Sequence, residues 1–249
     1  MTKNIFKTFN KNLNSLLPIG FNKVSLKLGK SYFFNKLSFR IQIKGISVFI
    51  GPNGTGKSTC IKLLAGLIEP DSGEVIFPRN EINSRIIGYV PQKIILLRRS
   101  VKENLSHALS ISGYPKNEKF SRIDEIIKFA KLKHLENISA RNLSMGQQQL
   151  VSIMRALALR PSFLFLDEPC ANLDLRTFQV IENLLKTASS CGIKIILVTH
   201  DLFQAKRLAD EILFFHNGKI TEQTRAKDFF KNPKSKQAKY FQNGLLLKE

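Results

Sequence analysis

The sequence feature that most constrains the fold of this chain is a glycine-rich stretch, Gly51-Pro-Asn-Gly-Thr-Gly-Lys-Ser58, which fits the pattern G-x-x-x-x-G-K-[ST]. The apolar run 46–50 before it predicts a buried strand, and residues 59–65 after it are spaced like one face of a helix. Backbone N–H groups at a helix N-terminus favour negative charge, so this strand, loop and helix predict a phosphate site. The residues expected there are Gly51, Pro52, Asn53, Gly54, Thr55, Gly56, Lys57, Ser58 and Thr59.

Three kinds of residue in this loop suit a nucleotide. The glycines at 51, 54 and 56 permit unusual φ angles and a close approach of the backbone to the ligand. Lys57 is expected to reach the β- and γ-phosphates, and the Ser58 hydroxyl is expected to ligate Mg²⁺. The loop therefore predicts a nucleotide site with a magnesium ion.

A second set of polar residues follows two later strands. The apolar strand 163–166 ends in Asp167 and Glu168, and the strand 193–198 is followed by Thr199-His200. A carboxylate at a strand end suits a magnesium contact for Asp167, and Glu168 is suited to polarise the water that attacks the γ-phosphate. His200 is expected beside the same phosphate.

The predicted elements alternate between strand and helix. The predicted strands are 24–28, 37–43, 46–50, 74–77, 85–90, 163–166, 193–198, 211–215 and 219–221, the last two joined by a turn at Asn217-Gly218. The predicted helices are 59–65, 101–135 with a break at Gly113, 146–159, 175–189, 202–209 and 226–249. Such alternation around a phosphate loop predicts an α/β fold with a largely parallel sheet flanked by helices.

Taken in order, the motifs resemble those of the ATP-binding subunits of ABC transporters, over residues 22–230. The matching segments are the Walker A motif Gly51–Ser58, Gln92 of the Q-loop, the signature Leu143–Gln147, the Walker B motif Phe163–Glu168, the D-loop Ala171–Asp174 and the switch histidine His200. Six motifs in sequence are far more specific than any one of them. This resemblance implies a P-loop NTPase core with a mixed, largely parallel sheet, an N-terminal antiparallel β-subdomain and a helical signature subdomain.

The resemblance also implies roles for individual residues. Catalysis is expected from Glu168, His200 and Gln92, and Mg²⁺ is expected on Ser58, Gln92 and Asp167. In this family two nucleotide-binding domains pair head to tail, so Ser144, Gly146, Gln147 and Asp174 are expected to contact ATP. The implied organisation is a basic extension at 1–20, a nucleotide-binding domain at 21–232 with a helical subdomain at about 93–155, and a lysine-rich tail at 233–249.

The implied assembly is a homodimer of nucleotide-binding domains with membrane permease subunits and an external substrate-binding protein, peripheral on the cytoplasmic face of the plasma membrane. The segments 95–101, 199–210, 229–233 and 244–246 are most similar to ATPases of oxyanion importers, above all the tungstate group. Phosphate, molybdate and polar amino-acid importers are close alternatives. The run Ile94–Leu97 beside Arg98 and Arg99 is either core or a groove that receives a permease helix.

Three positions depart from the family pattern. Met145 stands where the signature usually has glycine, and Leu150 stands where arginine is frequent. Leu28 falls where an aromatic ring often stacks on adenine, with Tyr32 and Phe33 as nearby substitutes. The signature and the adenine contact are therefore the expected points of difference.

The chain has 249 residues and a net charge of +20, and no Asp or Glu precedes Glu69. Compositional drift, attraction to an anionic membrane and nucleic-acid binding are three open explanations of this charge. The three cysteines show no paired spacing, which favours a reducing compartment over a disulfide framework. Residues 1–20 have a weak basic amphipathic pattern with Lys3, Lys7 and Lys11.

A soluble ABC ATPase that acts on DNA or ribosomes is the alternative from another functional class. Members that act in DNA repair need long insertions between the Q-loop and the signature, and only about fifty residues separate Gln92 from Leu143. Members that act in translation carry two cassettes, whereas this chain has one. A transport ATPase is therefore expected, and no nucleic-acid partner.

Overall fold

The structure is a computed structural model that describes residues 17–77, 87–171 and 173–245. The described residues form two compact units, a helix-rich unit of residues 87–193 and a sheet-rich unit of residues 17–77 and 194–245. The predicted amphipathic segment with Lys3, Lys7 and Lys11 lies outside the described residues, as do positions 85, 86 and 172 of the predicted motifs. Within the described ranges, no helix combines the length and apolar character that crossing a membrane requires.

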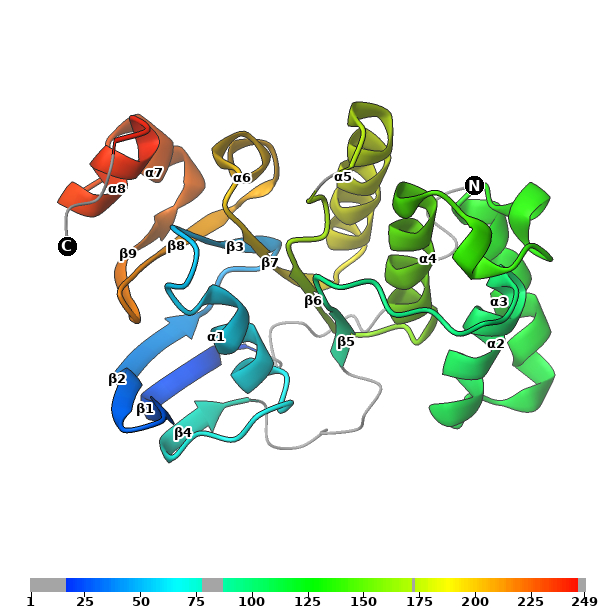
Figure 1. Ribbon diagram of the computed structural model, residues 1–249, viewed down its shortest axis with the longest axis horizontal. Coiled ribbons are helices and arrows are strands. Elements are labelled where there is room, and N and C mark those ends of the chain that lie inside the picture. The colour runs from blue at the N-terminus through cyan, green and yellow to red at the C-terminus, as the bar shows by residue number, and fades with distance from the viewer. Residues whose placement is uncertain (1–16, 78–86, 172, 246–249) are drawn as a thin grey trace. The chain divides into compact units, whose positions relative to one another are not determined.

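The sheet-rich unit begins with an antiparallel sheet of three strands in the order β2-β1-β4. Strands β1 (Ile19–Leu28), β2 (Ser31–Ile41) and β4 (Ser72–Ile76) form it (Figure 1). The first two strands begin earlier than predicted, because their antiparallel pairing continues from Ile19 opposite Ile41 to Leu28 opposite Ser31. Within it Phe21 lies opposite Phe39, with the ring centroids 4.9 Å apart. This sheet confirms the predicted N-terminal antiparallel subdomain.

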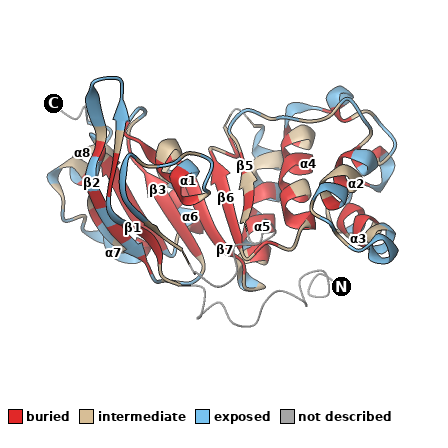
Figure 2. Cartoon of the chain, turned by 90° about the horizontal axis from the view of Figure 1, so that it is seen from below, coloured by how far each residue is buried: buried red, intermediate tan, exposed pale blue. Residues whose placement is uncertain are grey.

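Four further strands of this unit follow one another in the order β7-β3-β8-β9. Strands β7 (Lys194–Thr199), β3 (Ile46–Ile50) and β8 (Glu211–His216) run parallel, and β9 (Lys219–Arg225) returns antiparallel to β8. Asn217 and Gly218, both with positive φ, form the predicted turn between β8 and β9. Every residue of β3 and β7 is buried (Figure 2), as expected for central parallel strands.

The helices of the sheet-rich unit are short. Helix α1 (Lys57–Leu64) follows β3, and α6 (Leu202–Leu208) follows β7. The predicted helix over 226–249 is two helices, α7 (Ala226–Lys231) and α8 (Lys236–Gln242). Pro233 explains the break, because a residue that precedes proline is driven out of the helical region, and Asn232 has φ −155° and ψ 82°.

The helix-rich unit contains two parallel strands, β5 (Ile87–Val90) and β6 (Phe163–Asp167). Its helices are α2 (Val101–Ile111), α3 (Lys116–Phe129), α4 (Met145–Ala158) and α5 (Leu175–Ser190), and the break predicted at Gly113 falls between α2 and α3. Helix α4 packs against α2, α3 and α5 (Figure 1). Parallel strands with flanking helices in both units confirm the predicted α/β class.

Candidate functional site

The phosphate loop connects β3 to α1 in the sheet-rich unit, and its glycines adopt left-handed backbone angles. The φ angles of Gly51, Gly54 and Gly56 are 148°, 78° and 105°. A Cβ atom on Gly51 would lie 2.2 Å from the Phe215 carbonyl oxygen, and one on Gly56 would lie 2.6 Å from the Phe34 ring. Glycine is therefore required at these two positions by packing as well as by conformation.

Lys57 lies over this loop. Its buried Nζ donates hydrogen bonds to the carbonyl oxygens of Gly51 and Pro52, both at 2.7 Å. Thr55 Oγ1 donates to the same Pro52 oxygen at 2.8 Å, while Asn53 is exposed. A cation fixed at the start of a helix, beside the first backbone N–H groups of that helix, suits the phosphate chain predicted here.

Three side chains were expected as candidates to stack on adenine, and Phe33 lies best for that role. Its ring approaches within 3.1 Å of the position that a Cβ on Gly56 would take, so it borders the phosphate loop. Leu28 and Tyr32 are 59% and 54% exposed, and Lys27 Nζ lies 5.1 Å from the Tyr32 ring centroid. Of the three candidates, Phe33 is therefore the one whose ring borders the phosphate loop.

His200 follows β7 and is exposed at the start of α6. The next residue, Asp201, caps that helix through Oδ1, which accepts from the backbone N–H groups of Phe203 at 2.7 Å and Gln204 at 3.1 Å. The cap fixes where β7 ends and α6 begins, and this junction positions the imidazole. His200 and the phosphate loop both belong to the sheet-rich unit.

The carboxylates predicted at the end of β6 differ in environment. Asp167 is 3% exposed, whereas Glu168 is partly exposed and has a φ of 48°. A glutamate in the left-handed region costs about 1–2 kcal/mol, and such strain is concentrated at functional sites. Burial, followed by the charge of Asp167, raises the pKa of Tyr89 in β5 to about 12, so its phenol stays neutral.

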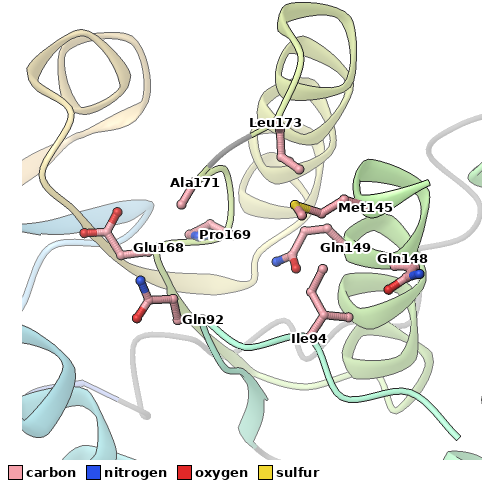
Figure 3. Close-up of a pocket in the computed structure, with 9 residues that line it drawn as sticks. All are labelled: Gln92, Ile94, Met145, Gln148, Gln149, Glu168, Pro169, Ala171 and Leu173. Atoms are coloured by element: carbon pink, nitrogen blue, oxygen red, sulfur yellow. The ribbon is translucent and has the colours of Figure 1, made fainter. Parts of the chain in front are cut away.

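A pocket of about 390 Å³ in the helix-rich unit gathers several predicted motifs (Figure 3). Gln92 and Glu168 lie on one side of it, and Met145 with the other α4 side chains lies on the opposite side. The complete lining is Gln92, Ile94, Met145, Gln148, Gln149, Glu168, Pro169, Ala171 and Leu173. The Q-loop, the end of β6, the signature and the D-loop therefore meet around one cavity.

Ser144 in the signature is the N-cap of α4 and is exposed. Its Oγ accepts from the Gln147 N–H at 3.3 Å, and Gln147 Oε1 accepts from the Ser144 N–H at 3.1 Å. This reciprocal capping box holds the serine at the helix N-terminus. Ser144 is therefore held as an exposed residue at the N-terminus of α4.

Gly146 is the position at which the signature helix α4 packs against Thr177 of α5. A Cβ atom at this position would lie 2.5 Å from Thr177 Cγ2, so the glycine allows α4 to approach α5 closely. Thr177 is bound in turn by Asp174, whose Oδ1 accepts from the Thr177 N–H at 2.9 Å and whose Oδ2 accepts from its hydroxyl at 2.6 Å. These hydrogen bonds, led by the hydroxyl, lower the pKa of Asp174.

The two departures in the signature have different environments. Met145 is 55% exposed and lines the pocket, so its side chain is accommodated without changing the Gly146–Thr177 contact. Leu150 is buried and lines a small apolar cavity with Met154 and Val180. An apolar residue is consistent with that environment.

The predicted site residues thus form one group in each unit. The sheet-rich unit holds the phosphate loop and His200, and the helix-rich unit holds Gln92, the signature, Asp167, Glu168 and Asp174. Sequence reasoning did not single out Gln149, which lines the pocket with its side chain buried. Its neighbours Gln147 and Gln148 have the same residue type, so no local signal distinguished it.

The profile described as ABC transporter matches residues 34–171 of the chain. The chain belongs to the ABC transporter family. This membership confirms the predicted family and ATPase class, and the fold agrees with it.

Two curated relatives of this ABC protein are importer components. The molybdate/tungstate import ATP-binding protein WtpC of Methanocaldococcus jannaschii is 35% identical over 86% of this chain and 73% of its own length. The spermidine/putrescine import ATP-binding protein PotA of Clostridium acetobutylicum is 34% identical over 88% of this chain and 64% of its own length. The chain thus spans about two thirds of the length of these relatives, and their named substrates differ in the sign of their charge.

A solved structure extends the comparison. A dimeric ATP-binding cassette in a post-hydrolysis state, bound to ADP and Pi, is 28% identical, with a TM-score of 0.73. The match covers 84% of this chain and 98% of the other. The ABC fold is therefore shared over nearly the whole of that cassette.

Proposed function

We propose that this chain is the ATP-binding and ATP-hydrolysing subunit of an importer that works with separate membrane subunits. The observation that carries the proposal is the end of β6, where buried Asp167 precedes Glu168 in a strained left-handed conformation at the edge of a pocket. Glu168 accepts the proton of the attacking water there, and Gln92 and His200 orient the water and the γ-phosphate.

The nucleotide is held by the phosphate loop. Lys57 exchanges its two carbonyl partners for the β- and γ-phosphates, and the N–H groups at the start of α1 bind phosphate oxygens. Phe33 stacks on adenine. Two copies pair head to tail, so that Ser144, Gly146, Gln147 and Asp174 of each copy complete the site of the other.

Magnesium is the metal that fits these residues. Ser58, Gln92 and Asp167 offer hard oxygen donors, and Mg²⁺ in nucleotide sites takes few protein ligands besides phosphate and water. The described residues contain no cluster of three His, Cys, Asp or Glu side chains that would indicate another metal. Bound Mg²⁺ would neutralise charge that develops on the phosphates.

The proposed cargo is an oxyanion of the tungstate and molybdate type, taken up through a permease and a substrate-binding protein. Similarity to WtpC supports this choice, and phosphate and polar amino acids are the related alternatives. The ATPase does not contact the cargo, so titration of the cognate binding protein with tungstate, phosphate and spermidine is the deciding test. Tight binding of spermidine, with no response to tungstate, would refute the oxyanion assignment.

The segment after Gln92 supports attachment to the membrane subunits. None of the four apolar residues Ile94–Leu97 is buried, and Ile95 is 59% exposed, so the run is a surface and not core. Arg98 and Arg99 are exposed beside it. An apolar surface with a charged rim suits a docked permease helix, and this supports the proposal that the subunit works at the cytoplasmic face of the membrane.

The test reverses the charge of Arg98 and Arg99 together to glutamate. Hydrolysis by the isolated subunit should be retained, while recovery of membrane subunits from native membranes and their stimulation of hydrolysis should be lost. The matched control reverses Lys116 at the start of α3 and Lys131 after its end, two exposed lysines, which changes the net charge equally at another part of the same unit. Wild-type assembly of the Arg98/Arg99 variant would refute docking at this surface, and nucleic-acid-stimulated hydrolysis would favour the soluble alternative.

A further inference from the structure

The pocket of the helix-rich unit contains a buried glutamine, Gln149, that has no part in the function proposed above. Gln149 lies one turn into α4, is 3% exposed and lines the pocket. Its Nε2 has no hydrogen-bond partner among the described residues. Burying an amide donor without an acceptor destabilises a folded protein, so the Gln149 amide lowers the stability of this conformation.

The adjacent residue shows what a purely structural glutamine does at this place. Gln148 Nε2 donates to the carbonyl oxygens of Leu143 at 2.9 Å and of Arg141 at 3.2 Å, and so ties α4 to the segment before it. Gln149, on the same helix turn, forms no such bond within the described chain. An acceptor for the Gln149 amide would therefore have to reach it in another state of the protein.

The side chains across the pocket limit the choice of acceptor. Figure 3 shows the amide of Gln149 directed toward the side on which Gln92 and Glu168 lie, and the remaining facing side chains are apolar. The proposed function gives the Glu168 carboxylate a different task, which is to accept the proton of the attacking water. Gln92 is exposed on the loop after β5, so its side chain reorients at little cost, and two amides can donate to each other's oxygen.

We propose that Gln149 is a positioning residue for ATP hydrolysis. When nucleotide is bound, its Nε2 donates to Gln92 Oε1 and fixes the orientation in which Gln92 faces the attacking water and the metal. To form this hydrogen bond, the exposed side chain of Gln92 only has to rotate into the cavity of about 390 Å³. No covalent bond is made or broken. This inference rests on the proposed function, because Gln92 has this task only where ATP is hydrolysed.

The first test replaces Gln149 by methionine, which has a similar length and no donor. Thermal stability should be equal to or higher than that of the wild type, because an unpaired buried donor is removed. The kcat should fall about threefold to tenfold with the KM for ATP within about twofold, as expected for one lost hydrogen bond in the transition state. A merely structural glutamine would instead lose stability and keep its kcat, and that result would overturn the proposal.

Thr221→Val is the matched control. Thr221 lies in β9 of the other unit, and its Oγ1 is also buried without a partner among the described residues. Valine has the same shape without the hydroxyl, so this variant should gain stability and keep the wild-type kcat. Loss of kcat in the control equal to that in Gln149→Met would show a general effect of altered stability and overturn the specific role.

The deciding experiment is a double-mutant cycle with Gln92→Met. If Gln149 acts through Gln92, the double variant should have the kcat of Gln92→Met within about twofold. ATP should also slow trypsin cleavage after Lys93 in the wild type and do so less in Gln149→Met. Multiplicative losses of kcat, or equal protection by ATP, would overturn the proposal. An inactive, folded wild-type protein would refute the proposed function itself, which separates the two failures.

Discussion

Arg122 in α3 is a buried cation that connects this helix to the end of α4. Its buried side chain donates from Nε to Ala158 O at 3.1 Å, from Nη2 to Leu157 O at 3.0 Å and from Nη1 to Glu125 Oε2 at 2.7 Å. The two carbonyls belong to the last turn of α4, where the helix dipole favours a cation. Burial, only partly offset by Glu125, lowers the pKa of this guanidinium.

The proposed change is Arg122→Met, which keeps the aliphatic chain and removes all three donors. Leu157 O still accepts from the Arg160 N–H at 3.1 Å, but buried Ala158 O loses the donor that Arg122 supplies. One unsatisfied buried carbonyl costs about 1–3 kcal/mol, and the other lost hydrogen bonds cost about 1–3 kcal/mol together. Relief of guanidinium desolvation offsets part of this, so the free energy of unfolding should fall by about 2–4 kcal/mol.

Urea unfolding at neutral pH, followed by far-ultraviolet circular dichroism, measures this loss. Arg160→Met is the matched control, because Arg160 Nη2 lies 3.8 Å from the same Glu125 oxygen but its side chain is 30% exposed. That longer, partly exposed pair should contribute less than about 1 kcal/mol. A loss below about 1 kcal/mol for Arg122→Met, or equal losses for the two variants, would refute this reasoning.

Two further predictions concern the sheet-rich unit. Phe33→Ala should raise the KM for ATP about tenfold at nearly constant kcat, since stacking a base on an aromatic ring contributes about 1–3 kcal/mol, while Tyr32→Ala should change little. Burial lowers the pKa of Lys194 from 10.5 to about 8, against the opposing charges of Glu211 and Asp210. The unfolded chain therefore binds more protons between these values, so the free energy of unfolding should rise with pH across this window, by up to about 3 kcal/mol relative to Lys194→Met. A pH-independent difference between the two proteins would contradict this.

The parts of the site that the sequence predicted are those encoded by contiguous residues. Strand 46–50, the loop that follows it and the carboxylates after strand 163–166 were each predicted from one short run, and the structure has these elements at those positions. The burial of Ile94–Leu97 was left open, because four apolar residues in a row fit both core and surface. Only the exposure of the side chains distinguishes these alternatives.

The parts that the sequence did not predict depend on distant residues. Lys194 Nζ donates to Ser47 Oγ at 2.7 Å, and Ser47 Oγ donates to Glu211 Oε2 at 2.6 Å, which connects three strands. These residues are far apart in the chain and match no local pattern. The glycine at 146 is a similar case, since the phosphate was the expected reason for it and Thr177 is a reason found only in the structure.

The most direct test of the proposed ATP hydrolysis compares wild type with Glu168→Gln. Glutamine keeps the size of the side chain but cannot accept the proton of the attacking water. We expect Glu168→Gln to bind ATP with wild-type affinity, to accumulate as an ATP-bound dimer and to hydrolyse ATP about 10²–10⁴-fold more slowly. Turnover of Glu168→Gln close to that of the wild type would show that Glu168 is not the general base and would contradict the proposed function of this site.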